Sequence, residues 1–318
     1  MSGGGADDGA PRRLIEPTTG RPILMAPGRQ ARPMHTASGH GHAATKPCPF
    51  CPGEEAQTPP EVEAVREAGS RADAPGWIAR AFANKYPACA VHEVIAEGAA
   101  HHEQPGDLDV ATWRAVVGLW CRRIAAIEAL PEVDNAYLFK NVGAAAGASI
   151  AHNHSQILGL SELPPRLVLE RDRAAQLDHC PWCRVLQTAA GDDRLVFETA
   201  AHAVVIPDPP RLPNEIWLLP KRCDDDLLRT DLDSLAAALQ HVFAALARGL
   251  DRPAFNIWLH RIPGAAFHWH FELQPRTGQM AGLELGGDMY INSVPPQVTM
   301  ARLRRGQQPA APPDTGTR

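Results

Sequence analysis

Two histidines and a glutamine stand at alternate positions directly after a run of small residues. His152, His154 and Gln156 follow the segment 143–149, which contains only glycine, alanine and serine. Alternate residues of a strand point to the same side, so both imidazoles are expected on one face. The small residues let the backbone approach a ligand, and successive N–H groups of such a turn can hold a phosphate. One imidazole can therefore bind a metal ion while the other faces a phosphate.

Four of the seven cysteines form two Cys-x-x-Cys pairs, Cys48 with Cys51 and Cys180 with Cys183. Such a pair places two thiolates on one tight turn, which is half of a tetrahedral zinc site. A redox pair is the alternative interpretation, but no strand–Cys-x-x-Cys–helix pattern of the thioredoxin type surrounds the first pair. The repetition of the motif also argues against coincidence. We expect one or two zinc ions per chain, with the metal at the second pair open between zinc and iron.

The ligands that the cysteine pairs lack are expected from histidines, which commonly complete such sites. For the first site the candidates are His92, His101, His102 and His152. For the second site they are His202 and His268, with His260 as an alternative to His202. The remaining thiols, Cys89, Cys121 and Cys223, are interpreted as ordinary buried or partly exposed cysteines.

The elements that position these residues occur twice in the same order. Each half has a Cys-Pro-x-Cys pair, several short strands, one long helix, a further strand and a His-x-His pair. The helices are predicted at 110–129, where apolar residues recur at three- and four-residue steps, and at 232–250. Strands are predicted at 77–82, 92–96, 136–140, 195–197, 203–206, 215–219 and 255–260. The repetition indicates an internal duplication in an α+β fold, with antiparallel sheets and helices packed against them.

Length and composition fit two folded domains. The chain has 318 residues, of which 44% are apolar, and a formal net charge of −5. That charge gives no basic field for a nucleic-acid backbone, and no apolar run reaches the length of a membrane span. No secretory signal is recognised at the start, so a cytoplasmic location is expected. The predicted domains are 13–165, with the nucleophile and first zinc site, and 166–304, with the second metal site; segments 1–12 and 305–318 are predicted to be disordered.

In combination, these motifs resemble the galactose-1-phosphate uridylyltransferase family of the histidine-triad superfamily. The resemblance runs from about residue 21 to residue 296 and implies two fused histidine-triad domains in a chain that usually dimerises. Its landmarks, in order, are Arg29-x-x-Arg32-Pro33, Cys48-Pro-Phe-Cys51, Asn84-Lys-Tyr-Pro87, Asn141-x-Gly143…Gly147-x-Ser149 and His152-x-His154-x-Gln156.

The resemblance implies a ping-pong nucleotidyltransferase in which His154 carries the nucleoside monophosphate. It also implies a first zinc site made by Cys48, Cys51, His101 and His152. Gln156 can donate a hydrogen bond to a phosphate oxygen but cannot deliver a proton, which suits transfer from a phosphate leaving group better than hydrolysis. The residues expected to contact phosphate or nucleotide are Arg29, Arg32, Asn84, Lys140, Asn141, Gly147 and Ser149.

Two departures point to one branch of that family. Asn153 and Ser155 stand where the galactose-pathway enzymes typically have proline and glycine, and the segment 282–292 lacks their Glu-x-Gln-Arg-Asp motif. The sequence is more similar to the branch typified by plant ADP-glucose phosphorylase, which moves an adenylyl group to inorganic phosphate. In this segment Glu284 is a candidate sugar or phosphate contact. The branch has a second zinc, for which the matching residues are Cys180, Cys183 and His268, with His202, or alternatively His260, as the candidate fourth ligand. His270 is interpreted as a vestigial counterpart of the nucleophile.

Three functional hypotheses follow. The first is nucleotidyl transfer between nucleotide sugars and hexose 1-phosphates, or phosphorolysis of a nucleotide sugar, with uracil and adenine both open. The second is phosphorolysis or hydrolysis of dinucleoside polyphosphates. The third is a zinc-binding module without enzymatic activity, which the acidic balance disfavours. Under the first, the partners are a nucleotide sugar, a sugar 1-phosphate or inorganic phosphate, and a second copy of the chain, with no nucleic acid and no membrane.

Overall fold

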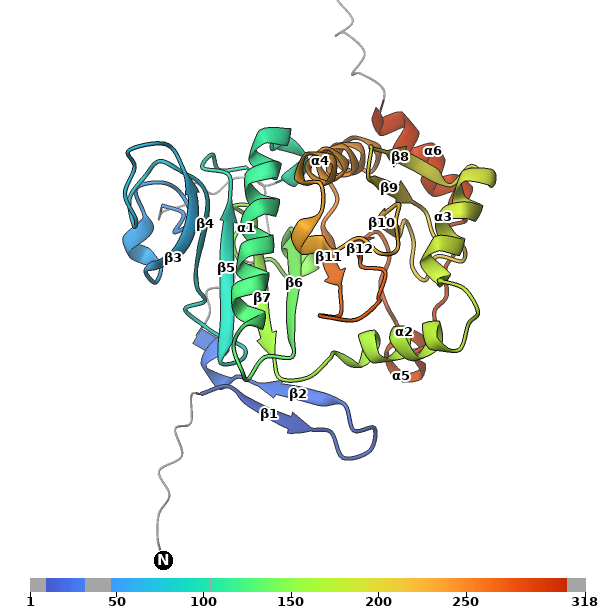
Figure 1. Cartoon of the computed structure of the whole chain (residues 1–318), viewed down its shortest axis with the longest axis horizontal. Helices are drawn as coiled ribbons and strands as arrows, with labels where there is room; N and C mark the ends of the chain where they lie inside the picture. Colours follow the sequence, from blue (N-terminus) through green and yellow to red (C-terminus); the bar gives the residue numbers. More distant parts are fainter. Residues whose placement is uncertain (1–9, 32–46, 103, 308–318) are drawn as a thin grey trace, which may run out of the picture.

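A computed structural model describes residues 10–31, 47–102 and 104–307. Its main element is a ten-stranded antiparallel sheet with helices packed against it, which confirms the predicted α+β class (Figure 1). Within the described residues, no helix is long and apolar enough to cross a lipid bilayer.

The ten strands fall into two halves that meet in the middle of the sheet. The first half contributes β3 (Glu61–Arg66), β4 (Trp77–Ala83), β5 (Val91–Glu97), β7 (His154–Leu160) and β6 (Asn135–Val142), in that spatial order. The second half continues with β11 (Phe255–His260), β12 (His270–Pro275), β10 (Ile216–Pro220), β9 (His202–Val205) and β8 (Leu195–Glu198). Read inward from either edge, the connectivity is the same, and β6 pairs with β11 at the junction. This repetition supports the predicted internal duplication.

Two equivalent helices cover one face of the sheet. They are α1 (Val110–Glu128), between β5 and β6, and α4 (Leu232–Gly249), between β10 and β11. Each begins at an aspartate whose carboxylate accepts a backbone hydrogen bond: Asp109 from Thr112 N and Asp231 from Ser234 N. Such caps satisfy N–H groups that the first helical turn leaves unpaired. The two helices pack against each other over the sheet (Figure 1).

The main hydrophobic core lies between these helices and the sheet. On α1 the predicted apolar positions, Trp113, Val116, Val117, Trp120, Ile124 and Ile127, are all buried. On β7 the core receives Ile157, and Trp120 Nε1 donates to Ser155 Oγ at 2.7 Å. Because side chains alternate along a strand, His154 and Gln156 must point to the opposite face. The sheet therefore separates the covered core from the face that carries the candidate nucleophile.

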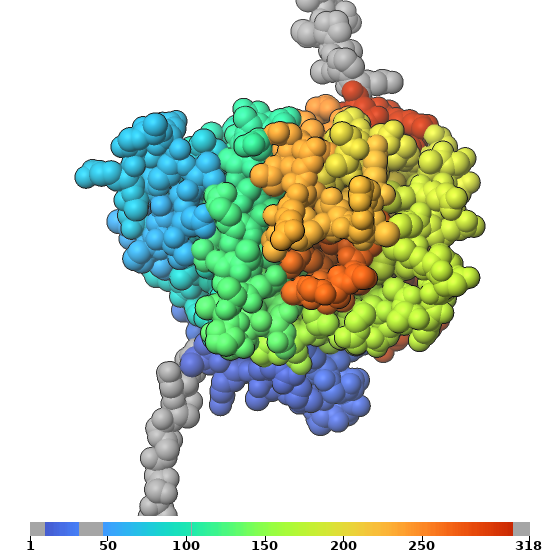
Figure 2. Space-filling model, viewed as in Figure 1, coloured from blue at the N-terminus to red at the C-terminus, as the bar shows by residue number. Residues whose placement is uncertain are grey.

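Smaller elements complete the chain. A hairpin of β1 (Arg12–Ile15) and β2 (Pro22–Met25) stands out from the body at its lower edge (Figures 1 and 2). Helices α2 (Pro165–Ala175) and α3 (Pro181–Gly191) precede the strands of the second half. Helices α5 (Gly282–Gly287) and α6 (Pro296–Gln307) follow them.

The predicted disordered ends were too long. Arg12 already belongs to β1, and α6 continues through Gln307. The end of α6 packs closely on α4, since a Cβ at Gly306 would lie 2.3 Å from the carbonyl oxygen of Ala245. Residues 305–307 were predicted to be disordered because the C-terminal segment is rich in glycine and proline. In the structure, however, it is the glycine that lets the end of α6 lie so close to α4. The domain boundary at 165/166 stays a prediction; residues 1–9 and 308–318 lie outside the described ranges.

Candidate active site and metal centres

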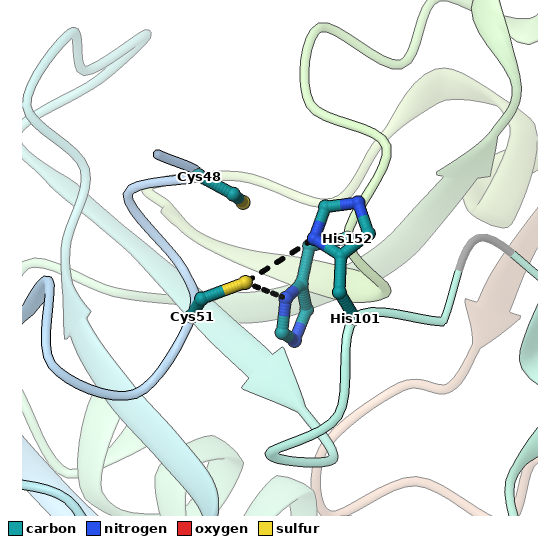
Figure 3. Close-up of side chains that lie close together, drawn as sticks. All are labelled: Cys48, Cys51, His101 and His152. Atoms are coloured by element: carbon teal, nitrogen blue, oxygen red, sulfur yellow. Dashed lines mark hydrogen bonds between the residues drawn. The ribbon is translucent and has the colours of Figure 1, made fainter. Parts of the chain in front are cut away.

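The first predicted metal group comes together as expected. Cys48, Cys51, His101 and His152 each point a ligand atom toward one centre, and these atoms all lie within 4.8 Å of one another (Figure 3). Cys51 Sγ lies 3.2 Å from His101 Nδ1 and 3.5 Å from His152 Nδ1. A tetrahedral zinc ion, with bonds of about 2.3 Å to sulfur and about 2.0 Å to nitrogen, separates such ligands by about 3.5 Å. The donor set and its spacing therefore fit a metal ion.

Local hydrogen bonds orient this group. The turn of the Cys-Pro-Phe-Cys motif is closed by Cys51 N, which donates to Cys48 O at 3.0 Å. His152 Nε2 donates to Gly98 O at 2.8 Å, so its Nδ1 carries the lone pair that faces the sulfur atoms. Burial lowers the pKa of His152 to about 4, which keeps this imidazole in the neutral form that binds metals. Burial, with the neighbouring Cys51, raises the pKa of Cys48 to about 11, so a cation is needed to stabilise the thiolate.

The imidazole of His154 is oriented by its neighbours. It begins β7, its side chain is 4% exposed, and its Nδ1 donates to the backbone oxygen of His152 at 2.8 Å. In the neutral ring, this bond places the proton on Nδ1 and the lone pair on Nε2. The ring of Phe50, from the cysteine turn, packs edge-on against the imidazole with centroids 5.3 Å apart. His152 thus connects the metal group to the candidate nucleophile through its side chain and its carbonyl.

Gln156 shares the face of His154 and is buried among polar partners. His92 Nε2 lies 2.9 Å from Gln156 Oε1, and Asn84 Nδ2 lies 3.5 Å from the same oxygen. Asn84, predicted as a nucleotide contact, is therefore brought to the site. His92, a candidate zinc ligand by sequence, is not part of the metal group.

Of the two arginines predicted to contact phosphate, only Arg29 lies within the described residues. Arg29 lies in a short 3₁₀ helix, Pro27–Ala31, and donates to the backbone oxygen of Tyr86 at 2.6 Å. Tyr86 N in turn donates to Asn84 Oδ1, so Arg29 is anchored to the turn that carries Asn84. Arg32 lies outside the described residues. A phosphate contact by Arg29 stays a prediction.

The glycine-rich turn is clamped by the second half of the chain. Gly143 (φ +79°) and Gly147 (φ +85°) flank a 3₁₀ turn, Ala144–Ala146, in conformations that favour glycine. Asn256 Nδ2 donates to Asn141 Oδ1 at 2.7 Å and to Ala146 O at 2.9 Å. Asn256 comes from β11 and no sequence motif marked it. Asn141 is thus tied to this turn, and the buried Ser149 follows it.

The predicted phosphate contact by Lys140 is wrong. Lys140 is 1% exposed, and its Nζ lies 2.6 Å from Glu97 Oε2 and 3.2 Å from the backbone oxygen of His154. It alternates with Phe139 and Asn141 along β6, so it points to the face covered by α1. A phosphate at His154 would lie on the other side of the sheet.

Glu284 makes a local cap. Its carboxylate accepts hydrogen bonds from Ala281 N at 2.9 Å and Ile291 N at 3.1 Å, which lower its pKa. Its role as a sugar contact stays a prediction.

The second metal group contains three of its four predicted members. Cys180 Sγ and Cys183 Sγ lie 3.4 Å and 3.6 Å from His268 Nδ1, which again suits tetrahedral geometry. His268 Nε2 donates to Pro220 O at 2.8 Å, as His152 does to Gly98.

The fourth predicted ligand, His202, does not belong to this group. Its Nδ1 lies 2.9 Å from Ser234 Oγ and its Nε2 lies 3.0 Å from Thr230 Oγ, so both ring nitrogens are bonded within the core. Burial lowers the pKa of His202 to about 4.

Cys223, predicted to be an ordinary thiol, stands beside this group. Burial raises the pKa of Cys183 to about 12, and hydrogen bonds and charge effects of Cys180 and Cys223 add to the shift. Cys223 also has a position in the second half like that of His101 in the first: it follows β10 by three residues, and His101 follows the equivalent β5 by four.

A third group was missed by the sequence analysis. Glu170, His260, His270 and Glu272 bring four ligand atoms within 4.8 Å of one another. The atoms involved, Glu170 Oε2, His260 Nδ1, His270 Nε2 and Glu272 Oε1, are buried and make no hydrogen bond, although His260 Nδ1 lies 2.9 Å from Glu170 Oε2. His270 begins β12 as His154 begins β7. Histidines with carboxylates form a donor set for a divalent transition metal.

Comparisons with known proteins agree over nearly the whole chain. The model of a domain of unknown function, DUF4921, matches residues 90–307. ADP-glucose phosphorylase of Arabidopsis thaliana is 28% identical over 342 residues, which cover 93% of this chain and 94% of the relative. Galactose-1-phosphate uridylyltransferase of Thermotoga maritima is 25% identical over 314 residues, covering 91% and 96%. The crystal structure of the Arabidopsis thaliana ADP-glucose phosphorylase with bound ADP-glucose has a TM-score of 0.71 at 26% identity, covering 93% of this chain and 99% of that one.

Proposed function

Because the chain belongs to the DUF4921 family and to the ADP-glucose phosphorylase-like branch of the galactose-1-phosphate uridylyltransferase family, we propose that it transfers a nucleoside monophosphate through His154. The donor is a nucleotide sugar, and the acceptor is inorganic phosphate or a hexose 1-phosphate. The observation that carries the proposal is the hydrogen bond from His154 Nδ1 to His152 O, because it leaves the lone pair on Nε2.

The reaction has two displacements at one phosphorus atom. In the first, the Nε2 lone pair of His154 forms a bond to the α-phosphorus, and the bond to the sugar 1-phosphate breaks with its electron pair on the leaving oxygen. The resulting phosphoimidazolium keeps its proton on Nδ1, which donates to the His152 carbonyl oxygen, and this bond stabilises the positive ring. In the second, an oxygen of the acceptor attacks the same phosphorus and returns the lone pair to Nε2. No proton transfer is required, which fits a glutamine at position 156.

We propose metal ions at three places. Zinc would bind Cys48, Cys51, His101 and His152, and zinc or iron would bind Cys180, Cys183, Cys223 and His268. A divalent transition metal would bind the group Glu170, His260, His270 and Glu272. At the first site a bound ion would cross-link the cysteine turn to the residues before β7, and would so hold the carbonyl that orients His154.

The proposed assembly is a homodimer in the cytoplasm. All seven cysteines are free, which fits a reducing compartment.

The test is formation of the covalent intermediate. The zinc-loaded protein is incubated with ADP-glucose or UDP-glucose without acceptor, and its intact mass is measured. We expect an acid-labile increase equal to AMP or UMP, which names the base, and its absence in His154→Gly. His179→Gly, at an exposed histidine, is the matched control and should keep the adduct. No adduct with either donor would overturn the proposal and direct the test to dinucleoside polyphosphates.

A further inference from the structure

His92 contacts the side chain of Gln156 from the neighbouring strand, β5. It lies at the second position of β5, is 4% exposed, and presents its two ring nitrogens to different partners. Nδ1 lies 3.0 Å from the backbone nitrogen of Ala88. Nε2 lies 2.9 Å from Gln156 Oε1 and 3.1 Å from Asn84 Nδ2. None of these contacts involves a residue of the metal groups.

The contact with Ala88 determines where the ring carries its proton. A backbone N–H can only donate, so His92 Nδ1 must accept and therefore carries the lone pair. In a neutral imidazole the proton is then on Nε2. The Nε2–H group faces Gln156 Oε1 and donates to it.

This donation fixes the amide of Gln156. With its oxygen bound to His92, the amide presents its NH₂ group in the other direction. Rotation of the amide by half a turn would break this bond and bring two donors against each other. Asn84 adds a second donor: its Oδ1 accepts from Tyr86 N at 2.8 Å, so its Nδ2 carries the NH₂ group. This Nδ2 lies 3.1 Å from His92 Nε2 and 3.5 Å from Gln156 Oε1. Since both nitrogens are donors, they converge side by side on the one acceptor, Gln156 Oε1.

The orientation matters because a phosphate oxygen only accepts hydrogen bonds. An amide NH₂ stabilises the charge that develops during transfer, whereas an amide oxygen would repel it. We propose that His92 is a positioning residue for the transfer reaction, which holds the NH₂ group of Gln156 toward the phosphate. The inference rests on the proposed function of His154 and adds a residue that does not itself touch the substrate.

Two substitutions separate the hydrogen bond from packing. His92→Phe keeps a ring of similar size but has no donor, whereas His92→Gln places an amide N–H the same number of bonds from the backbone as Nε2. The rate of adduct formation is measured in a single turnover at saturating donor, and the final amount of adduct counts the active sites. We expect His92→Phe to lower the rate per active site about tenfold or more. His92→Gln should recover most of this loss.

The dependence on Gln156 is tested by a double substitution. In a Gln156→Ala background, His92→Phe should cause no further loss of rate, because the group that it positions is gone. A purely structural role would lower the melting temperature and the number of active sites while leaving the rate per site unchanged. An unchanged rate per site in His92→Phe, or full additivity of the two substitutions, would overturn the inference.

A spectroscopic measurement makes the test independent of activity. In protein labelled with ¹⁵N-histidine, the His92 signals are identified by their loss in His92→Phe. We expect the Nε2–H form, with the change in Gln156→Ala confined to the Nε2 resonance. The Nδ1–H form would refute the inference even if the adduct forms. If the Nε2–H form is present but the wild-type protein makes no adduct, the function of His154 fails and the role of His92 in transfer fails with it, while its contact with Gln156 remains.

Discussion

The ammonium nitrogen of Lys140 lies 2.6 Å from Glu97 Oε2, on the face of the sheet opposite to His154. Both side chains are buried, at 2% and 0% exposure. Burial lowers the pKa of Lys140, and the adjacent carboxylate opposes this shift. An ion pair in this position stabilises the fold only while both partners are present.

Replacing one partner should therefore destabilise the protein more than replacing both. We expect Lys140→Met to lower the free energy of unfolding by about 3–5 kcal/mol, because Glu97 would be left charged and unpaired. Lys140→Met with Glu97→Met should recover part of the loss, as measured by urea denaturation. Any remaining activity of the folded protein should show a KM for the nucleotide sugar within about threefold of wild type. A KM more than tenfold higher with unchanged stability would instead support the phosphate contact predicted from sequence.

The first metal group should be required for adduct formation. Cys51→Ser removes the thiolate closest to His101 and His152, so the orientation of the His152 carbonyl should be lost with the metal. We expect one metal ion fewer per chain by elemental analysis and little or no covalent adduct. Cys121→Ser, at a thiol outside all three groups, is the control and should keep both the metal content and the covalent adduct of the wild type. Full adduct formation by metal-depleted Cys51→Ser would show that the reaction of His154 does not depend on the metal.

Cys223 should be a ligand of the second group. Cys223→Ser leaves three donors, so metal bound there should exchange into a chelator at least tenfold faster than in wild type. The adduct at His154 should form at a near-normal rate, since this group lies in the other half of the sheet. Equal retention of metal in Cys223→Ser and Cys121→Ser would show that the Cys223 thiol is not a ligand.

The third group should bind its own metal ion. Glu272→Gln keeps the shape of the side chain but removes a negative charge that two buried histidines face. We expect the metal content to fall by one ion per chain while the two cysteine-containing groups stay loaded. Glu67→Gln, at an exposed carboxylate of the first half, is the control. An unchanged metal content in Glu272→Gln would indicate that the four side chains share protons rather than a cation.

His202 should make the stability depend on pH. Its pKa is about 4 in the folded protein and about 6.5 in the unfolded chain, so between these values only the unfolded state takes up the proton. Stability from the neutral ring is thus complete above pH 6.5 and is lost as the pH falls toward 4. The loss is on the order of 3 kcal/mol at the slope of about 1.4 kcal/mol per pH unit. His202→Asn, which cannot titrate, should flatten the decline in urea midpoints over this range; parallel curves would contradict the assignment.

Residues that lie close together in sequence were the ones that sequence patterns could place. His152, His154 and Gln156 form one motif, and the cysteine pair belongs to one turn, so their spacing already constrains their geometry. Lys140 could have been placed correctly as well, because in an alternating strand it shares a face with the buried Leu138 and not with Phe139. His202 failed for a different reason. Its hydroxyl partners lie 28 and 32 residues further along the chain, and no local pattern links a histidine to them.

The third metal group and Asn256 illustrate the same limit. Glu170 comes from α2, while its partners come from the ends of β11 and β12. Only the pairing of the two halves brings Asn256 to the glycine-rich turn, 115 residues from Asn141. Such contacts depend on tertiary topology, for which the internal repetition was the only available signal.

The β6–β11 junction joins two equivalent strands in antiparallel register. Two identical copies of a half-length chain would adopt the same arrangement across a two-fold axis, each closing the open edge of the other. In such an ancestral pair every site would exist twice, and any substitution would change both copies of the site. Joining the copies in one polypeptide removed that constraint. One half could keep a nucleophile followed by glutamine, while His270 and Glu272, at the matching positions of the other half, were free to gather with Glu170 and His260.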